Sequence, residues 1–233
     1  MQADWLSRER ALIGGEAVEK LRNASVTVFG LGGVGGAAVE GLVRAGIENI
    51  TIIDHDVISS SNLNRQIITN VHNVGKLKTD ETRQRILSIN PNANVTVINE
   101  FVKKENIDSI LEAEYVIDAI DTVTSKICII EAALKRNLQI ISCMGTGNKL
   151  DPSKFKIADI SKTTMCPLAR VMRRELKLRG ISNVDVLYSD EQPINIATRT
   201  PASISFVPPV AGFMLAGWVI RKIISTERLS TDS

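Results

Sequence analysis

The sequence SVTVFGLGGVGGAAVEGLVRAG, residues 25–46, joins a short apolar segment to an alanine-rich one through a glycine-rich turn. The β-branched residues of 25–30 predict a buried strand, and residues 33–45 predict a helix. The turn between them holds four glycines: Gly30, Gly32, Gly33 and Gly35. Because glycine has no side chain, the turn can be tight, and its backbone N–H groups can approach a phosphate at the positive end of the helix. The segment therefore predicts a Rossmann-like strand–turn–helix unit that binds a nucleotide.

Strand and helix patterns continue to alternate up to residue 147. The further strands are predicted at 49–54, 94–99, 115–120 and 139–144, and the helices at 75–89 and 124–136. Short apolar strands separated by helices indicate an α/β fold with a doubly wound, mostly parallel sheet.

The pattern changes in the last third of the chain. Strands are predicted at 155–160, 184–189 and 203–208, with one helix at 166–179 among them and a final helix at 209–224. We expect antiparallel strands to extend the sheet here. The whole chain, 1–233, is then a single domain, with a nucleotide-binding part at 1–147 and a sheet extension at 148–233.

The composition excludes several classes of protein. The chain has 233 residues, 44% of them hydrophobic and 23% charged, which excludes a disordered or collagen-like chain. Its three cysteines form no CxxC pair, which excludes a four-thiolate zinc site. The polar start lacks a signal-peptide core, and the apolar stretch 207–220 is shorter than the roughly 20 residues of a membrane span. We therefore expect a cytoplasmic protein with no membrane span.

Charged residues after the second strand distinguish two kinds of nucleotide. Asp54 ends that strand, where a carboxylate can bind ribose hydroxyls, as it also does in NAD enzymes. Arg65, Lys76 and Lys78 follow, and a triphosphate with its leaving pyrophosphate needs such positive charge, whereas a nicotinamide arm does not. Asp121 follows the fourth strand and can hold Mg²⁺ between phosphate oxygens.

Each of these residues also has a simpler interpretation. Arg65 and Lys78 can lie on a solvated loop and helix face, and Asp118 and Asp121 can be strand-end and helix-cap carboxylates. Their order along one chain favours a nucleoside triphosphate site.

Five motifs in this order, GLGGVG, IIDHD, SNLNRQ, VGKLK and DAIDT, resemble the ThiF/MoeB/HesA superfamily of adenylating enzymes, which is related to ubiquitin-activating enzymes. The resemblance implies ATP and Mg²⁺ as cofactors, a homodimer, and attack of a carboxylate on ATP to give an acyl-adenylate and pyrophosphate. It implies that Asp54 binds ribose, that Asn64, Arg65 and Lys78 line the phosphates, and that Asp121 holds Mg²⁺. It also implies an arginine that reaches the partner's ATP, which is Arg8, with Arg10 as the alternative. Asp56 and Gln66, within the same motifs, complete the expected nucleotide-binding set.

The identity of the activated carboxylate depends on residues 145–180, GTGNKLDPSKFKIADISKTTMCPLARVMRRELKLRG. This stretch resembles the tRNA threonylcarbamoyladenosine dehydratase branch of the superfamily. The resemblance implies a tRNA partner whose modified adenosine is adenylated on its threonyl carboxylate and then closed to a cyclic form from within. Such internal attack needs no protein nucleophile. Two alternatives are adenylation of the C-terminus of a ubiquitin-like sulfur-carrier protein, with a sulfur-relay partner protein, and a nicotinamide-dependent oxidoreductase.

The charge distribution independently favours an RNA partner. Residues 161–180 hold six basic residues and one acidic residue, a local +5 that leaves −3 for the rest of a +2 chain. Four of the basic residues share the i, i+3, i+4, i+7 spacing of one helical face: Arg170, Arg173, Arg174 and Lys177. Such a face suits a phosphate backbone, and its simpler interpretation is a solvated face of an amphipathic helix.

Cys166 has two interpretations. Distant relatives form a thioester at a cysteine, but no histidine or acid flanks Cys166, and it directly precedes a helix-initiating proline, Pro167.

Overall fold

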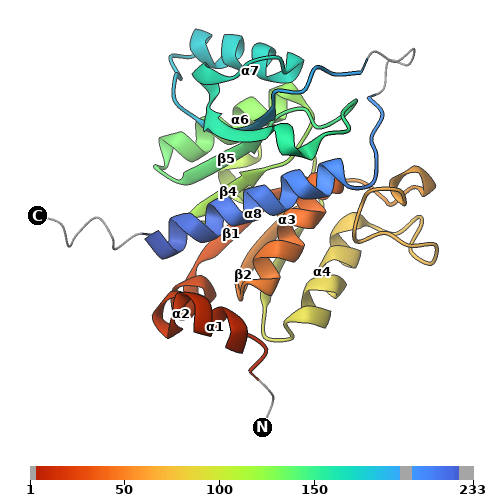
Figure 1. Cartoon of the computed structure of the whole chain (residues 1–233), viewed down its shortest axis with the longest axis vertical. Coiled ribbons are helices and arrows are strands. Elements are labelled where there is room, and N and C mark those ends of the chain that lie inside the picture. Colours follow the sequence, from red (N-terminus) through yellow and green to blue (C-terminus); the bar gives the residue numbers. More distant parts are fainter. Residues whose placement is uncertain (1–3, 195–200, 226–233) are drawn as a thin grey trace, which may run out of the picture.

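The computed structural model of the chain describes residues 4–194 and 201–225, and its strands form one seven-stranded sheet (Figure 1). The order across the sheet is β3-β2-β1-β4-β5-β7-β6. The strands are β1 (Ser25–Phe29), β2 (Asn49–Ile53), β3 (Asn94–Ile98), β4 (Tyr115–Asp118), β5 (Gln139–Cys143), β6 (Phe155–Asp159) and β7 (Asp185–Ser189).

The sheet is mostly parallel, as the sequence predicts. β1 pairs in parallel with both β2 and β4, and β5 pairs in parallel with both β4 and β7. β6 pairs with β7 in antiparallel fashion, with Ile157 opposite Leu187. The predicted antiparallel extension is therefore confirmed as this one pair at the sheet edge.

Helices cover both faces of the sheet, because successive strand residues point to opposite sides. In β1, Val26 and Val28 pack with α2, α3, α4 and α8, whereas Phe29 packs with α5, α6 and α7 on the other face. The helices are α1 (Ser7–Ile13), α2 (Gly15–Asn23), α3 (Gly33–Arg44), α4 (Lys78–Ile89), α5 (Ile107–Ile110), α6 (Val123–Lys135), α7 (Pro167–Leu178) and α8 (Val207–Ser225). Short 3₁₀ turns lie at Ser60–Asn62, Pro152–Lys154 and Ile160–Lys162.

The predicted strand at 203–208 is wrong. Residues 203–206 belong to no strand, and α8 begins at Val207 with Pro208 and Pro209 in its first turn. Proline is well placed there, because the first N–H groups of a helix have no partner within the helix. The alternation of Ser203, Ile204, Ser205 and Phe206 resembles a strand pattern, but the segment instead leads the chain into the helix.

Other helix boundaries also differ from the prediction. The predicted helix 75–89 begins at Lys78, because Gly75 has φ +89° and Leu77 forms a bridge with Val57. The sequence patterns missed α1, α2 and α5, and Gly14, with φ +88°, separates the first two of these.

The helix α8 is apolar and packs lengthwise along α3 (Figure 1). A side chain at Gly212 would place its Cβ 2.1 Å from the carbonyl oxygen of Val34, so the two helices require glycine at this contact. Among the described residues, α8 is the one helix whose length and composition would suit a membrane span, and half of its most apolar window is buried in the fold. Its packing is that of a core helix.

Candidate active site

A cleft of about 330 Å³ lies at the carboxyl ends of the parallel strands. It opens beside β1 and β4, where the chain order reverses across the sheet, which is the usual ligand position in doubly wound folds. The cleft collects nine of the residues that the sequence predicts for the site: Gly30, Gly32, Gly33, Asp54, Asp56, Arg65, Gln66, Lys78 and Asp121.

The glycine turn forms the floor of the cleft and opens α3. Gly30 has φ +85°, and a Cβ there would lie 2.8 Å from the carbonyl oxygen of Ala119. A Cβ at Gly35 would lie 1.7 Å from the carbonyl oxygen of Gly30. Gly35 therefore does not line the cleft: it allows the first turn of α3 to pack against the end of β1. The first N–H groups of α3 have no partner within the helix, and Gly32, Gly33 and Val34 line the cleft, so this end of the helix favours an anion there.

Asp54 shapes this turn. Its Oδ2 accepts a hydrogen bond of 2.6 Å from the N–H of Leu31, and its Oδ1 accepts one of 2.8 Å from the N–H of Asp56. The carboxylate therefore ties the end of β2 to the glycine turn, and it stands in the cleft with lone pairs left for ligand hydroxyls.

Lys78 lies between two carboxylates. Its Nζ is 2.6 Å from Oδ2 of Asp56 and 4.0 Å from Oδ2 of Asp54, and the residue is only 5% exposed. The simpler interpretation of Lys78, a solvated helix face, is therefore wrong. The lysine is held in the wall of the cleft by the acids that flank it.

Arg65 lines the cleft and is held there by hydrogen bonds that the sequence pattern does not reveal. Its guanidinium donates to the carbonyl oxygen of Ser61 and to Oδ1 of Asn64, both at 2.8 Å. Asn64 in turn donates from Nδ2 to the carbonyl oxygen of Ser203 at 2.9 Å. Asn64 does not itself line the cleft, and it links Arg65 to the segment that precedes α8.

The side-chain oxygen of Gln66 indicates what kind of ligand the cleft can hold. Its side chain is buried in the cleft wall, yet no group among the described residues donates to its Oε1. A buried acceptor without a partner is costly, and a ligand donor would satisfy it. This acceptor, the anion-attracting turn and the two cations Arg65 and Lys78 together fit a nucleoside phosphate.

Two acidic groups in the cleft are candidates for a metal ion. Asp54, His55 and Asp56 offer atoms within 4.8 Å of one another, but Lys78 already pairs with both carboxylates, most closely with Asp56. Asp121 is exposed at the edge of the cleft and accepts a bond of 3.4 Å from Thr122 Oγ1. One free carboxylate beside a phosphate is a typical Mg²⁺ arrangement, so Asp121 fits the ion better than the group around Asp54.

The predicted interchain arginine lies outside the cleft, on α1. Arg8 is exposed, whereas Arg10 is held within its own chain by Asp4 at 3.3 Å and Glu19 at 3.9 Å. Of the two candidates, Arg8 is the one left available to a second molecule.

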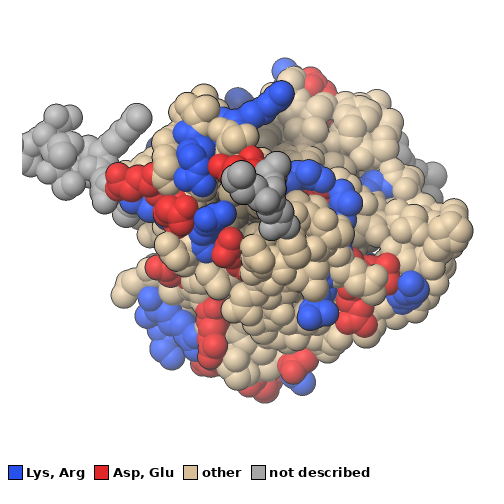
Figure 2. Space-filling view, turned by 90° about the horizontal axis from the view of Figure 1, so that it is seen from below, with Lys and Arg blue, Asp and Glu red and all other residues tan. Residues whose placement is uncertain are grey.

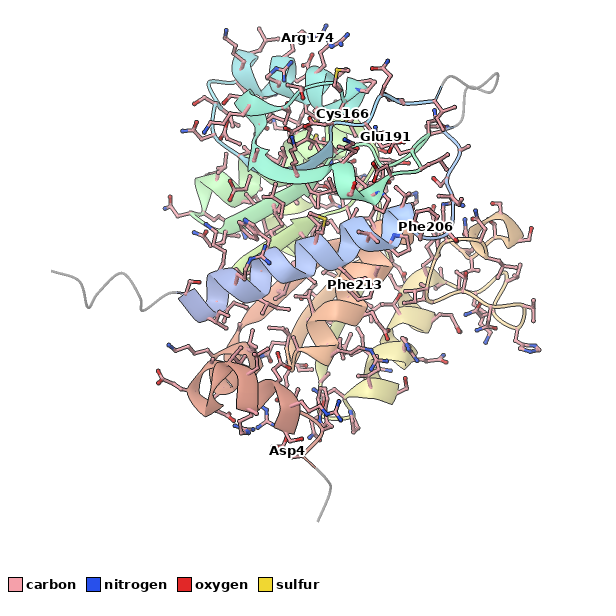
Figure 3. All side chains as sticks on the ribbon, viewed as in Figure 1. Asp4, Cys166, Arg174, Glu191, Phe206 and Phe213 are labelled. Carbon is pink, nitrogen blue, oxygen red and sulfur yellow. The ribbon has the colours of Figure 1, made fainter. Side chains whose placement is uncertain are left out.

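The predicted basic face lies on α7, whose opposite side packs on the sheet through Ala169, Met172 and Leu176. Arg170, Arg174 and Lys177 are exposed, and Figure 3 shows Arg174 at the outer edge of the helix. Arg173 differs, because it is half-buried and donates to the carbonyl oxygen and Oγ1 of Thr163, at 2.7 and 2.8 Å. The face presented to solvent therefore has three cations.

Sequence reasoning missed a buried lysine behind the cleft. Lys126 is fully buried on α6 and lies 2.8 Å from Asp118. It shares the i, i+3, i+4, i+7 face of Ile129, Ile130 and Ala133. A charged residue on that apolar face was the signal available in the sequence.

Two of the three cysteines, Cys143 and Cys166, lie in the core, whereas Cys128 is half-buried. Cys166, only 3% exposed, caps α7 and packs in the core cluster, away from the cleft lining. Burial raises the pKa of the Cys143 thiol to about 12. Both placements favour the structural interpretation of these residues.

The ThiF family profile matches residues 6–232, nearly the whole chain. The chain belongs to the ThiF family. Among its ThiF relatives, the tRNA threonylcarbamoyladenosine dehydratase of Bacillus subtilis (strain 168) is 39% identical over 94% of both chains. The enzyme Adenylyltransferase and sulfurtransferase UBA4 of Vanderwaltozyma polyspora is 36% identical over 58% of this chain and 31% of its own length.

Solved structures agree with this ThiF assignment. The E. coli tRNA N6-threonylcarbamoyladenosine dehydratase, TcdA, in complex with AMP superposes with a TM-score of 0.92 at 31% identity, covering 98% of both chains. The same enzyme in complex with ATP gives a TM-score of 0.90, covering 97% of this chain and 96% of that one.

Proposed function

We propose that this chain is an ATP-dependent tRNA threonylcarbamoyladenosine dehydratase. It adenylates the threonyl carboxylate of threonylcarbamoyladenosine in tRNA, and the adenylate then closes to the cyclic form, so that AMP and pyrophosphate are released. The observation that carries the proposal is a single cleft that gathers the glycine turn, Asp54, Arg65, Lys78 and Asp121. The near-complete match to a Bacillus subtilis dehydratase and to structures of the E. coli enzyme with ATP and AMP supports it.

The cleft residues have different roles in the first step, the adenylation of the carboxylate. The N-terminus of α3 and the cations Arg65 and Lys78 stabilise the charge that develops on the departing pyrophosphate. Asp54, together with Asp56, binds the ribose hydroxyls, and Oε1 of Gln66 accepts a hydrogen bond from the nucleotide. Asp121 holds Mg²⁺, which when bound neutralises phosphate charge.

The second step needs positioning more than it needs a protein nucleophile. A group within the substrate attacks the acyl carbon and expels AMP, and the net change is the loss of one water. Holding the reacting groups together can supply much of the required acceleration. The burial of Cys166 agrees with a reaction that uses no thiol.

We place the tRNA on the exposed cations of α7. Arg170, Arg174 and Lys177 form a compact basic surface that suits the phosphate backbone. At the opposite end of the molecule, acidic and basic side chains are interspersed (Figure 2). The charge distribution therefore favours α7 as the RNA side.

We also propose a homodimer in the cytoplasm, with the whole chain folded as one domain. Phe213 on α8 is 45% exposed (Figure 3). Together with Val210 and Met214 it lines a shallow hollow. Exposed apolar surfaces of this kind mark contacts with a partner, here a second copy of the chain. The β5–β7 pairing carries the sheet without a break from one part of the chain to the other, which supports one domain.

The experiment compares two acyl substrates under the same conditions. The protein is incubated with ATP, Mg²⁺ and either tRNA bearing threonylcarbamoyladenosine or a ubiquitin-like carrier protein, and pyrophosphate and AMP are measured. Release that depends on the modified tRNA supports the proposal. Pyrophosphate exchange that depends on the carrier protein and not on the modified tRNA contradicts it. That result would favour the alternative, in which the carrier works with a sulfur-relay partner protein.

A further inference from the structure

A buried ion pair lies behind the wall of the cleft that carries Asp121. Lys126 Nζ is 2.8 Å from Oδ2 of Asp118, and both side chains are fully buried. The same carboxylate oxygen accepts a hydrogen bond of 2.6 Å from Ser142 Oγ. None of these three side chains lines the cleft.

The pair holds Ile120 through both of its backbone polar groups, which belong to two successive peptide units. Oδ1 of Asp118 accepts the N–H of Ile120 at 3.2 Å, and Lys126 Nζ donates to the carbonyl oxygen of Ile120 at 3.0 Å. That carbonyl shares a rigid peptide plane with the N–H of Asp121. The ion pair therefore fixes the path of residues 119–122, here called the Asp121 loop.

Apart from these bonds to Ile120, the Asp121 loop has few contacts that fix the side chain of Asp121. Its first residue is tied to β1, because the N–H of Ala119 donates to the carbonyl oxygen of Phe29 at 2.8 Å. Asp121 itself is exposed, and the one side-chain bond it accepts within the described structure is the 3.4 Å contact from Thr122. The backbone beneath it is therefore the main determinant of where its carboxylate lies.

Stability alone does not explain a buried ion pair. Removing two charges from water costs about as much as their attraction returns, and an apolar pair of the same size is often as stable. The neighbours of Lys126 on the same face of α6 are apolar, so an apolar residue would fit the packing. The hydrogen bonds to the Asp121 loop are what an apolar pair would lose.

We propose that Lys126 and Asp118 are positioning residues of the ATP-dependent reaction. They hold the Asp121 loop so that the carboxylate of Asp121 would be in place to hold Mg²⁺, and Ser142 orients Asp118. This inference rests on the proposed function, since it concerns the same nucleotide cleft.

The test is the Mg²⁺ dependence of ATP binding, measured by titration calorimetry on the full chain. The double variant Asp118→Asn/Lys126→Met removes both charges together, so no uncompensated charge remains in the core. We expect the half-saturating Mg²⁺ concentration to rise by about tenfold, as when groups that orient a metal ligand are lost. ATP affinity without Mg²⁺ stays at the wild-type value.

Ser142→Ala gives a milder version that keeps both charges. We expect a smaller rise in the half-saturating Mg²⁺ concentration, in the same direction. If the double variant fails to fold, Ser142→Ala still tests the proposal.

A matched control is the partly buried ion pair of Glu40 with Arg85, which lies away from the cleft lining. Glu40→Gln/Arg85→Met lowers the melting temperature and leaves the Mg²⁺ dependence unchanged. Wild-type Mg²⁺ dependence in the Lys126 and Ser142 variants, or an equal shift in the control, overturns the positioning role. Absence of ATP binding by the wild-type protein contradicts the proposed function instead.

Discussion

At the scale of single residues, Asp121 is the acidic group whose role can be tested with least effect on the fold. It is exposed, and its side chain accepts one long hydrogen bond. We expect Asp121→Asn to reduce pyrophosphate release by at least about 100-fold, because a metal ligand is lost. The free energy of unfolding changes by no more than about 0.5 kcal/mol, as for other surface substitutions. Steady-state pyrophosphate release and urea denaturation measure the two effects, and full turnover in the variant would remove Asp121 from the mechanism.

Cys166 distinguishes the dehydratase from a thioester-forming enzyme. Its side chain is buried in the core and lies away from the cleft lining. We expect Cys166→Ala to keep turnover of the modified tRNA within about twofold and to lower stability by about 1 kcal/mol, because a small buried group is lost. Single-turnover assays with the wild-type protein as control check this. Loss of turnover in a folded variant would favour the thioester route.

The sequence predicted which charged residues meet in the cleft better than it predicted their surroundings. Asp54 and Asp121 follow parallel strands, and the carboxyl ends of such strands lie at one edge of a sheet, so their convergence is a consequence of topology. Lys78 and Asn64 follow irregular segments with no periodicity. Their burial and hydrogen bonds depend on loop conformations that spacing does not encode.

At the scale of secondary-structure elements, Glu40 connects α3 to α4. Burial acts to raise the pKa of Glu40, but hydrogen bonds from Arg85 and Arg44 outweigh it and hold the pKa below its usual 4.5. A carboxyl with a lowered pKa in the folded state stabilises the protein above its ordinary pKa, and this contribution is lost as the pH falls through the lowered value. We expect Glu40→Gln to reduce the free energy of unfolding by about 2 kcal/mol near pH 7.

The difference between Glu40→Gln and the wild-type protein should shrink as the pH falls below 4.5. Urea denaturation at a series of pH values measures it. An effect that stays constant down to acidic pH would mean that packing, and not the charge of Glu40, stabilises the contact between the helices.

The helix α7 provides a test of RNA binding that leaves the cleft intact. Arg170→Gln/Lys177→Gln removes two exposed cations, and we expect weaker tRNA binding at low salt. The slope of log affinity against log salt should fall in magnitude by roughly 2, since each phosphate contact contributes about 0.9. Filter binding across a salt series measures the slope. An unchanged slope would place the RNA elsewhere, and ATP affinity serves as the control.

The elements that the sequence predicted well are those with strong periodicity. The strands before residue 147 and the helices α3, α6 and α7 match their patterns, because each buries one face or both. The segment at 203–206 misled the prediction because its polar–apolar alternation matched a strand. The helices α1 and α2 were missed because Gly14 and Gly15 interrupt an otherwise helical run.

At the scale of the whole molecule, the proposed homodimer can be tested on α8. Phe213→Glu places a charge on the apolar outer face of that helix, and we expect self-association to weaken by at least tenfold, since a buried aromatic side chain contributes about 1.5–3 kcal/mol. Analytical ultracentrifugation measures this. Val71→Glu is the control, because Val71 is 72% exposed and lies outside α8. Equal self-association of both variants would place the interface elsewhere.

The net charge of +2 is the sum of a basic segment and an acidic remainder, which lie in different parts of the fold. The basic excess of residues 161–180 lies on α7 at one end of the molecule, and the acidic remainder includes the carboxylates that surround the cleft. One protein thus offers a basic surface for a polyanion and a cleft built for a nucleotide. This arrangement is what the proposed reaction on tRNA requires.

Mass analysis of nucleosides tests this account most directly. The protein is incubated with ATP, Mg²⁺ and tRNA that carries threonylcarbamoyladenosine, and the tRNA is digested under mild conditions. We predict that the modified nucleoside is converted to a product lighter by one water, only when ATP is present. An unchanged nucleoside, together with active adenylation of a carrier protein, would contradict it.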